Sequence, residues 1–199
     1  GVEMLLGRRV KTIEENKLVV TTSDGEVTLE AGTICWTAGV AASPLGKLLA
    51  ERTGCSVDRG GRLPVEPDFS IPGHPEIRVV GDLCSYSHTK NGKPLPGMAG
   101  PAVQMGGWVA KDILAKLQNQ SHAPFVFTDF GSMAVVGPLF AVADLRGIKM
   151  SGALGWLIWG LAHLAFIPDN ENRITLLTKW LWMIVTRERS ALVITEAHS

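Results

Sequence analysis

The hydrophobic residues of the chain are most concentrated near its C-terminal end, in two stretches that a polar link separates. The first stretch covers residues 152–166, and the second covers 174–185, where Lys179 interrupts it. At about 1.5 Å per residue, a helix over 152–166 would be about 22 Å long, whereas a bilayer core of ~30 Å requires about 20 apolar residues. The pattern therefore predicts two short helices, neither of which spans a membrane.

Tryptophan is frequent in these two stretches, which hold four of the six tryptophans of the chain: Trp156, Trp159, Trp180 and Trp182. Tryptophan is favoured at the membrane–water boundary because its ring is apolar and its N–H is polar. We therefore expect residues 151–199 to form an amphipathic, membrane-associating helical hairpin that lies on the bilayer surface. A hairpin buried at a dimer interface is the alternative, and one hairpin could serve both purposes. His163, inside the first stretch, is expected to be a packed or hydrogen-bonded helix residue and not a ligand.

The preceding part of the chain alternates between strand-like and helical patterns. Residues 8–36 carry short β-branched runs with a turn at Asp24-Gly25, which predicts a three-stranded meander followed by an apolar strand into a Gly/Ala turn. Helical spacing predicts a short helix between Pro44 and Gly54 and a longer one over 101–117. Two further strand-like regions are "IRVVGD", which ends in Gly81-Asp82, and residues 119–150.

Composition excludes several classes of protein. Lysine plus arginine and aspartate plus glutamate each number 19, so the net charge is zero, and a nucleic-acid binder would need a basic excess. The cysteines, Cys35, Cys55 and Cys84, are odd in number and form neither a CxxC pair nor a cluster with histidine. We therefore expect no disulfide framework and no metal site.

Glycine spacing limits what kind of nucleotide site these residues can contain. None of the 22 glycines lies two positions from another, so the GxGxxG fingerprint cannot occur. The chain begins without methionine or a signal segment, and we expect it to be a C-terminal fragment whose phosphate loop precedes Gly1. Two other candidates for a ligand site are "WTAGV" and "VVGD", each a predicted strand that ends in a turn containing glycine. In open α/β sheets, ligands bind beyond the carboxyl ends of the strands. Asp82 could accept a hydrogen bond from a ribose or polyol hydroxyl, or it could be a helix N-cap.

Five segments, taken in order, resemble a known family: "TICWTAGVAASPLGKLLAE", "DRGGRLPVEPDFSIPGHPEIRVVGD", "LPGMAGPAVQMGGWVAKDIL", "FTDFGSMAVVG" and "GWLIWGLAHLAF". Together they resemble the C-terminal half of type II NADH:quinone oxidoreductases, which are flavoenzymes related to the pyridine nucleotide-disulfide reductases. The resemblance implies an α/β fragment with mixed α+β character, the C-terminal part of a two-Rossmann flavoprotein reductase. It also implies a division into the end of an NADH-binding domain (1–40), part of an FAD-binding domain (41–118), a β-rich segment near the flavin (119–150) and the hairpin (151–199).

The resemblance also assigns roles to individual residues. Thr37, Ala38 and Gly39 match the turn back into the FAD domain, and Gly81 and Asp82 match the Gly-Asp that holds the ribityl-pyrophosphate part of FAD. The segment 99–104 matches the AQxAxQ motif beside the flavin ring and the quinone. It implies that Ala99, Gly100 and Pro101 contact the cofactor and that Gly100 and Gln104 belong to the quinone site. Lys149 lies in "RGIKMSG", which resembles the family's strand that returns towards the flavin, so it could stabilise a developing quinolate at the quinone site or be an exposed strand lysine. Gly100 departs from the motif, whose first glutamine it replaces, so one hydrogen-bond donor to the quinone is missing.

For the whole protein, the resemblance implies hydride transfer from NADH to FAD and transfer of two electrons to a membrane quinone, without proton pumping. It implies a peripheral, monotopic homodimer on the cytoplasmic face of the inner membrane. Because the main FAD and NADH phosphate loops would lie before Gly1, we expect this fragment to be inactive by itself. Two alternatives stay open. A sulfide:quinone reductase would need Cys35 and Cys84 near the flavin, and a non-catalytic membrane-binding module would hold no flavin.

Overall fold

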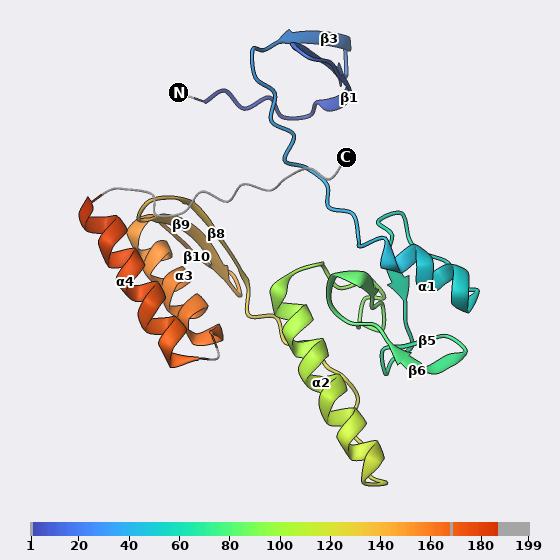
Figure 1. The fold of residues 1–199 in the computed structure, drawn as a ribbon. Coiled ribbons are helices and arrows are strands. Elements are labelled where there is room, and N and C mark those ends of the chain that lie inside the picture. The colour runs from blue at the N-terminus through green and yellow to red at the C-terminus, as the bar shows by residue number, and fades with distance from the viewer. Residues whose placement is uncertain (1, 168, 187–199) are drawn as a thin grey trace.

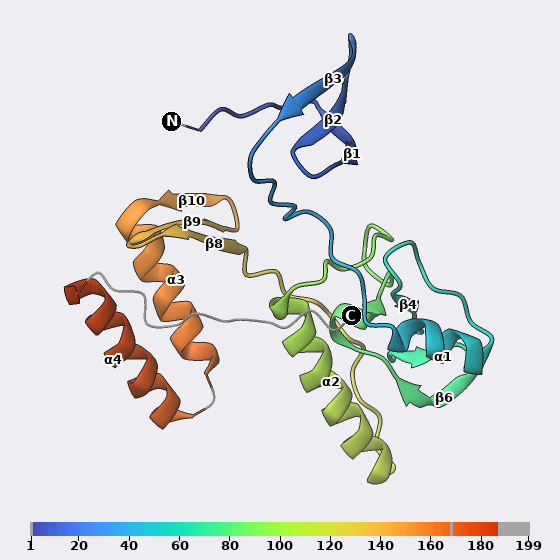
Figure 2. The same cartoon turned by 45° about the horizontal axis from the view of Figure 1, so that its top comes forward.

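The computed structural model describes residues 2–167 and 169–186, which form four small β-sheets and four α-helices (Figure 1). The first sheet is the predicted meander: β1 (Arg9–Ile13), β2 (Lys17–Thr22) and β3 (Gly25–Glu30) pair antiparallel in that order. Gly25 follows the turn with a positive φ of 128°, as the Asp24-Gly25 signal predicted. The meander stands apart from the rest of the described chain in both views (Figures 1 and 2).

The connection from β3 to the first helix differs from the prediction. Residues 31–43 contain no strand, and Trp36 is 60% exposed, so the apolar run at 33–36 is extended chain without a pairing partner in the described structure. The helix α1 (Leu45–Thr53) then begins after Pro44 and ends at Gly54, whose left-handed conformation (φ 72°) lets its N–H donate to Ala50. Both helix boundaries were predicted.

The largest core lies between α2 (Ala99–Leu117) and a set of very short strands. β4 (Leu63–Pro64) pairs in parallel with β7 (Cys84–Ser85), and β5 (Ser70–Ile71) pairs antiparallel with β6 (His74–Arg78). The expected strand at "IRVVGD" is therefore shorter than predicted, because β6 ends at Arg78 and a 3-10 turn, η1 (Gly81–Leu83), follows. The fully buried side chains of this core include Leu63, Phe69, Ile71, Pro101 and Met105.

After α2 the chain doubles back along the helix in an extended stretch without strand pairing, residues 121–131, which we call the return segment (Figure 1). The expectation of strands throughout 119–150 was therefore wrong for this stretch. Its alternation of buried Phe125, exposed Val126 and half-buried Phe127 has the period of a strand, but the buried side chains pack against the α2 core.

The last sheet and the last two helices form one unit. β8 (Ser132–Gly137), β9 (Phe140–Leu145) and β10 (Ile148–Ser151) are antiparallel with β9 in the middle. α3 (Gly152–Phe166) packs on β9 so closely that a Cβ at Gly155 would lie 2.5 Å from the carbonyl oxygen of Ala141. α4 (Asn170–Thr186) lies beside α3 (Figure 2). Within residues 2–167 and 169–186, no helix is both long and apolar enough to cross a membrane.

Candidate functional site

The turn η1 meets the N-terminal end of α2, and this meeting brings together residues that are distant in the sequence. A Cβ at Gly81, whose φ is +70°, would lie 3.6 Å from the Cβ of Ala102, and one at Gly97 would lie 3.5 Å from Oδ1 of Asp82. Gly81 and Asp82, which the strand-end pattern singled out, therefore lie against the start of α2. The carboxylate of Asp82 is exposed and free to face a ligand.

The first turn of α2 suits a ligand with negative charge. The N–H groups of a first helical turn have no intrahelical acceptor and carry partial positive charge, and this turn holds no acidic side chain. Pro101 is fully buried and anchors the turn in the core. A Cβ at Gly100 would meet no heavy atom within 4 Å, so the space beside the turn is open.

Gln104, one turn further along α2, is held by the return segment. Its Nε2 donates to the carbonyl oxygen of Thr128 at 2.9 Å, and its Oε1 accepts from the N–H of Thr128 at 3.0 Å. The same helix face provides a second tie, because Nε1 of Trp108 donates to the carbonyl oxygen of Ala123 at 2.9 Å. The prediction placed Gln104 at the quinone, and the structure gives its amide a protein partner that sequence reasoning missed.

A hollow of ≈ 700 Å³ lies beside the N-terminal end of α2. Its walls come from the loop before the helix and from the return segment, and they include Tyr86, Leu95, Met98, Phe127 and Asp129. The predicted quinone residue Lys149 lies elsewhere, exposed on β10 opposite Asp144, where it lines a hollow of ≈ 440 Å³ on the β8–β10 sheet. Thr37, Ala38 and Gly39 are exposed in the connection between β3 and α1.

The cysteines differ in environment. Cys84 is buried, and burial raises the pKa of its thiol to about 12 although the charge of Arg62 opposes this. Cys35 is exposed, and the Sγ of half-buried Cys55 lies 3.0 Å from Oγ1 of Thr53. In the part of the chain that the structure describes, no group of histidine, cysteine and acidic residues could hold a metal ion.

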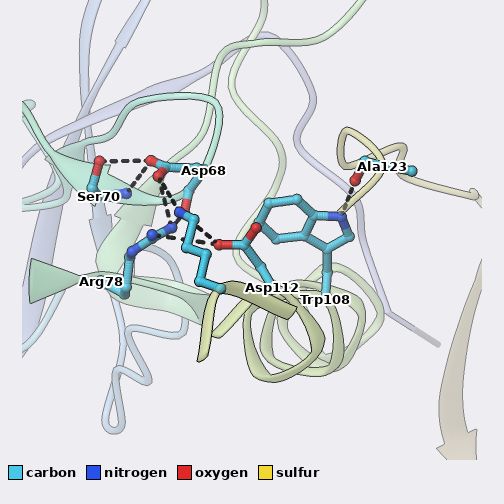
Figure 3. A network of polar contacts seen from close by, with 7 residues as sticks. Asp68, Ser70, Arg78, Trp108, Asp112 and Ala123 are labelled. Atoms are coloured by element: carbon cyan, nitrogen blue, oxygen red, sulfur yellow. Dashed lines mark hydrogen bonds and ion pairs between the residues drawn. The ribbon is translucent and has the colours of Figure 1, made fainter. Parts of the chain in front are cut away.

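An ion network fastens the far half of α2 to the β5–β6 hairpin, and sequence analysis did not predict it (Figure 3). Arg78 lies 3.0 Å from Asp68 and 3.4 Å from buried Asp112, while Lys116 lies 3.2 Å and 3.0 Å from the same two carboxylates. Burial alone would raise the pKa of Asp68, but hydrogen bonds from Ser70 and Lys116 and the charge of Arg78 lower it to about 2. The hydrogen bond to Asp112 raises the pKa of Lys116. The i,i+4 spacing of Asp112 and Lys116 was the one signal visible in the sequence.

Three of the four predicted membrane tryptophans meet inside the α3–α4 hairpin. The ring centroid of Trp180 lies 5.8 Å from that of Trp156 and 5.4 Å from that of Trp159, and a Cβ at Gly160 would lie 3.2 Å from the ring of Trp180. Trp182 is 61% exposed. His163 is hydrogen-bonded, as expected, with Nδ1 2.8 Å from the carbonyl oxygen of Trp159.

Exposed apolar side chains form a ridge on each helix at spacings of three or four residues. We call the set the leucine ridge: Leu154, Leu157, Leu161, Ile174, Leu177 and Leu181. A hydrogen bond also ties the first turns of α4 to the end of α3, because Nε of Arg173 donates to the carbonyl oxygen of Ile167 at 2.8 Å.

Comparison with known proteins defines the class. Residues 1–106 match the pyridine nucleotide-disulphide oxidoreductase family, and the chain belongs to that family. Its fold matches that of NDH2 from Plasmodium falciparum, solved in complex with NADH, with a TM-score of 0.72 and 14% identity over 89% of this chain and 50% of that one.

The more specific resemblance to type II NADH:quinone oxidoreductases is confirmed by the curated relatives. The chain is 40% identical to the type II NADH:quinone oxidoreductase Ndh of Mycobacterium tuberculosis, in an alignment that covers 100% of this chain and 42% of that protein. It is 34% identical to the type II NADH:quinone oxidoreductase of Staphylococcus haemolyticus over 76% of this chain and 37% of that one. The chain thus spans about two fifths of the relatives that it matches.

Proposed function

We propose that the protein containing these residues is an FAD-dependent NADH:quinone oxidoreductase. The observation that carries the proposal is the meeting of Gly81 and Asp82 with the open first turn of α2. It is supported by the family match and by relatives named as type II NADH:quinone oxidoreductases. In this proposal the regions 1–40, 41–118, 119–150 and 151–199 have the domain roles that the resemblance implies.

The residues at this site fit a flavin. Asp82 would accept hydrogen bonds from the ribityl hydroxyls, with Gly81 allowing close approach, and the open surface at Ala99, Gly100 and Pro101 would leave room for the ring system. The positive end of α2 would favour the negative charge of the reduced flavin. When bound, FAD would supply the redox chemistry, accepting a hydride from NADH and passing two electrons to quinone.

Membrane attachment in this proposal is peripheral and uses the α3–α4 hairpin. The leucine ridge is apolar and exposed, which suits insertion into the headgroup–acyl boundary. Trp182 would contact lipid directly, and Trp156, Trp159 and Trp180 would act by holding the two helices together. A location on the cytoplasmic face of the inner membrane and a homodimer complete the proposal.

The two alternatives predict different observations. The high pKa of buried Cys84 keeps its thiol protonated, which disfavours the thiolate that a sulfide:quinone reductase would need. A non-catalytic membrane-binding module would purify without flavin, so the visible absorbance of the protein as encoded by its gene separates it from the enzyme.

Substitution of Asp82 tests the site. Asp82→Ala should lower the flavin content of the purified protein, and NADH:menadione turnover should fall in proportion because the variant removes a cofactor ligand. Asp24→Ala, which changes an exposed aspartate in the β2–β3 turn, is the matched control and should keep both. Full flavin content and turnover in Asp82→Ala would refute this assignment of the site.

A further inference from the structure

Gln104 makes an unusual contact for a residue expected to bind quinone. Its amide meets both backbone groups of Thr128, with an N–H donated at 2.9 Å and a carbonyl oxygen accepting at 3.0 Å. Two hydrogen bonds between planar groups fix the orientation of the amide as well as its position. The Gln104 side chain therefore provides the donor and the acceptor that a neighbouring strand would provide, and in the described structure residues 121–131 have no such strand.

The contact fixes one wall of the hollow beside α2. Phe127 and Asp129, the neighbours of Thr128, line the ≈ 700 Å³ hollow together with Met98, which is the N-cap of α2. Toward the other end of the return segment, the Trp108–Ala123 hydrogen bond and the buried ring of Phe125 hold the backbone independently. On the α2 side, Gln104 therefore holds the backbone between residues 127 and 129, while Nε of Arg146 holds the carbonyl oxygen of Asp129 from the β9–β10 turn.

We propose that Gln104 is a positioning residue, which holds residues 127–129 as the wall of the quinone pocket and does not itself serve as the quinone ligand. We call the two hydrogen bonds between Gln104 and Thr128 the clamp, and these bonds are seen directly in the structure. That the pocket binds a quinone rests on the proposed function. In this proposal the second glutamine of the motif binds the protein backbone, and the substrate uses the open surface at Gly100.

Hydrogen exchange on the protein as encoded by its gene tests the clamp without any substrate. Gln104→Ala should raise the exchange rate of the Thr128 N–H about tenfold, measured on a peptide covering 125–131, because the amide loses its only hydrogen-bond acceptor of the described structure. Gln118→Ala, at the other end of α2, is the control and should leave this peptide unchanged. Unchanged exchange in Gln104→Ala would overturn the clamp even if the protein proved to have another activity.

Kinetics test the consequence. Gln104→Glu keeps the acceptor for the Thr128 N–H but places a carboxylate against the Thr128 carbonyl, because an ionised carboxylate cannot donate. We expect the KM for menadione to rise about five- to tenfold, while the rate with ferricyanide, which takes electrons from reduced flavin without a quinone pocket, stays as in the wild type. If Gln104→Glu does not fold, Gln104→Asn, which is too short to reach Thr128, replaces it.

Acidic pH supplies a rescue that a simple packing role would not show. In the Gln104→Glu variant, a protonated carboxyl would again donate to the Thr128 carbonyl. The pKa of a free glutamate side chain is about 4.3, so the protonated fraction grows as the pH falls. The ratio of variant to wild-type KM should therefore fall as the pH is lowered from about 7.5 to about 5. A raised KM in Gln104→Glu without rescue at low pH, together with unchanged hydrogen exchange in Gln104→Ala, would mean that Gln104 contacts the quinone directly, and it would overturn the proposal. Absence of quinone turnover in the wild type would instead overturn the proposed function.

Discussion

Gly100 is the residue at which this chain departs from the motif that its sequence resembles. The resemblance places a glutamine at this position, and the structure leaves open space around it, since an added Cβ would meet no atom within 4 Å. Larger side chains therefore fit here. The amide of Gln104 is hydrogen-bonded to Thr128 in the return segment. A glutamine at position 100 would extend into open space, so its amide would be available to a substrate.

Gly100→Gln should therefore bind quinone more tightly. We expect the KM for menadione to fall about fivefold, the equivalent of one additional hydrogen bond, and the free energy of unfolding to rise by less than about 1 kcal/mol because glycine is a poor helix former. Gly107→Gln is the matched control, since Gly107 is also helical and open but lies two turns away. It should show the gain in stability alone. An unchanged KM in Gly100→Gln would place the quinone elsewhere.

Asp68 gives the ion network a defined pH dependence. Its pKa is about 2 in the folded protein, against an ordinary value of 3.8. A carboxyl whose pKa is lowered by folding stabilises the protein above its unfolded-state pKa, and this contribution is lost as the pH falls from about 4 toward about 2. Because the side chain is partly exposed, we expect only about 1 kcal/mol. Urea unfolding of wild type and Asp68→Asn should differ by this amount at pH 6 and converge near pH 2; a constant difference would contradict the assignment.

The α3–α4 hairpin separates two tasks between two sets of apolar side chains. Tryptophans at positions 156, 159 and 180 pack between the helices, and the leucine ridge is exposed. Bulky aromatic rings suit the interior of a hairpin because each buries a large area, while exposed leucines suit an acyl boundary. Composition alone does not separate these tasks, because both stretches are rich in tryptophan and leucine, and only the structure shows which side chains pack between the helices and which are exposed.

Charges placed on the leucine ridge should abolish membrane binding without unfolding the hairpin. Leu157 and Leu161 are 51% and 59% exposed, so Leu157→Glu with Leu161→Glu should preserve the helical circular dichroism. Sedimentation with phosphatidylglycerol vesicles should fall on the order of 100-fold, because two charges replace apolar insertion. Asn172→Glu, exposed on the side of α4 opposite the leucine ridge, should bind like the wild type. Normal sedimentation of the double variant would exclude the ridge as the contact.

Helices were predictable from the sequence, and the unpaired extended segments were not. α1 and α3 follow from local signals, namely Pro44 and Gly54 at the ends of one and an uninterrupted apolar run in the other. The return segment has the period of a strand, and only the distant partners Gln104 and Trp108 make it a single extended chain along a helix. The Asp68–Arg78–Asp112 network was equally invisible, because its members lie far apart in the sequence.

A continuous set of contacts links the candidate flavin site to the hairpin. The return segment leads from Gln104 into β8, and Nε of Arg146, in the β9–β10 turn, donates to the carbonyl oxygen of Asp129 at 2.9 Å. β9 in turn packs on α3 through the close approach of Gly155 to Ala141. The structure thus connects the first turn of α2, where the proposal places the flavin, to the α3–α4 hairpin, where the proposal places the membrane contact.

Anaerobic titration of the protein as encoded by its gene tests the central claim most directly. The purified protein should carry a visible flavin absorbance band, NADH should bleach it, and one equivalent of menadione should restore it, because the claim requires both half-reactions on a single cofactor. A protein without flavin, or a bleached flavin that menadione does not reoxidise, would contradict the account.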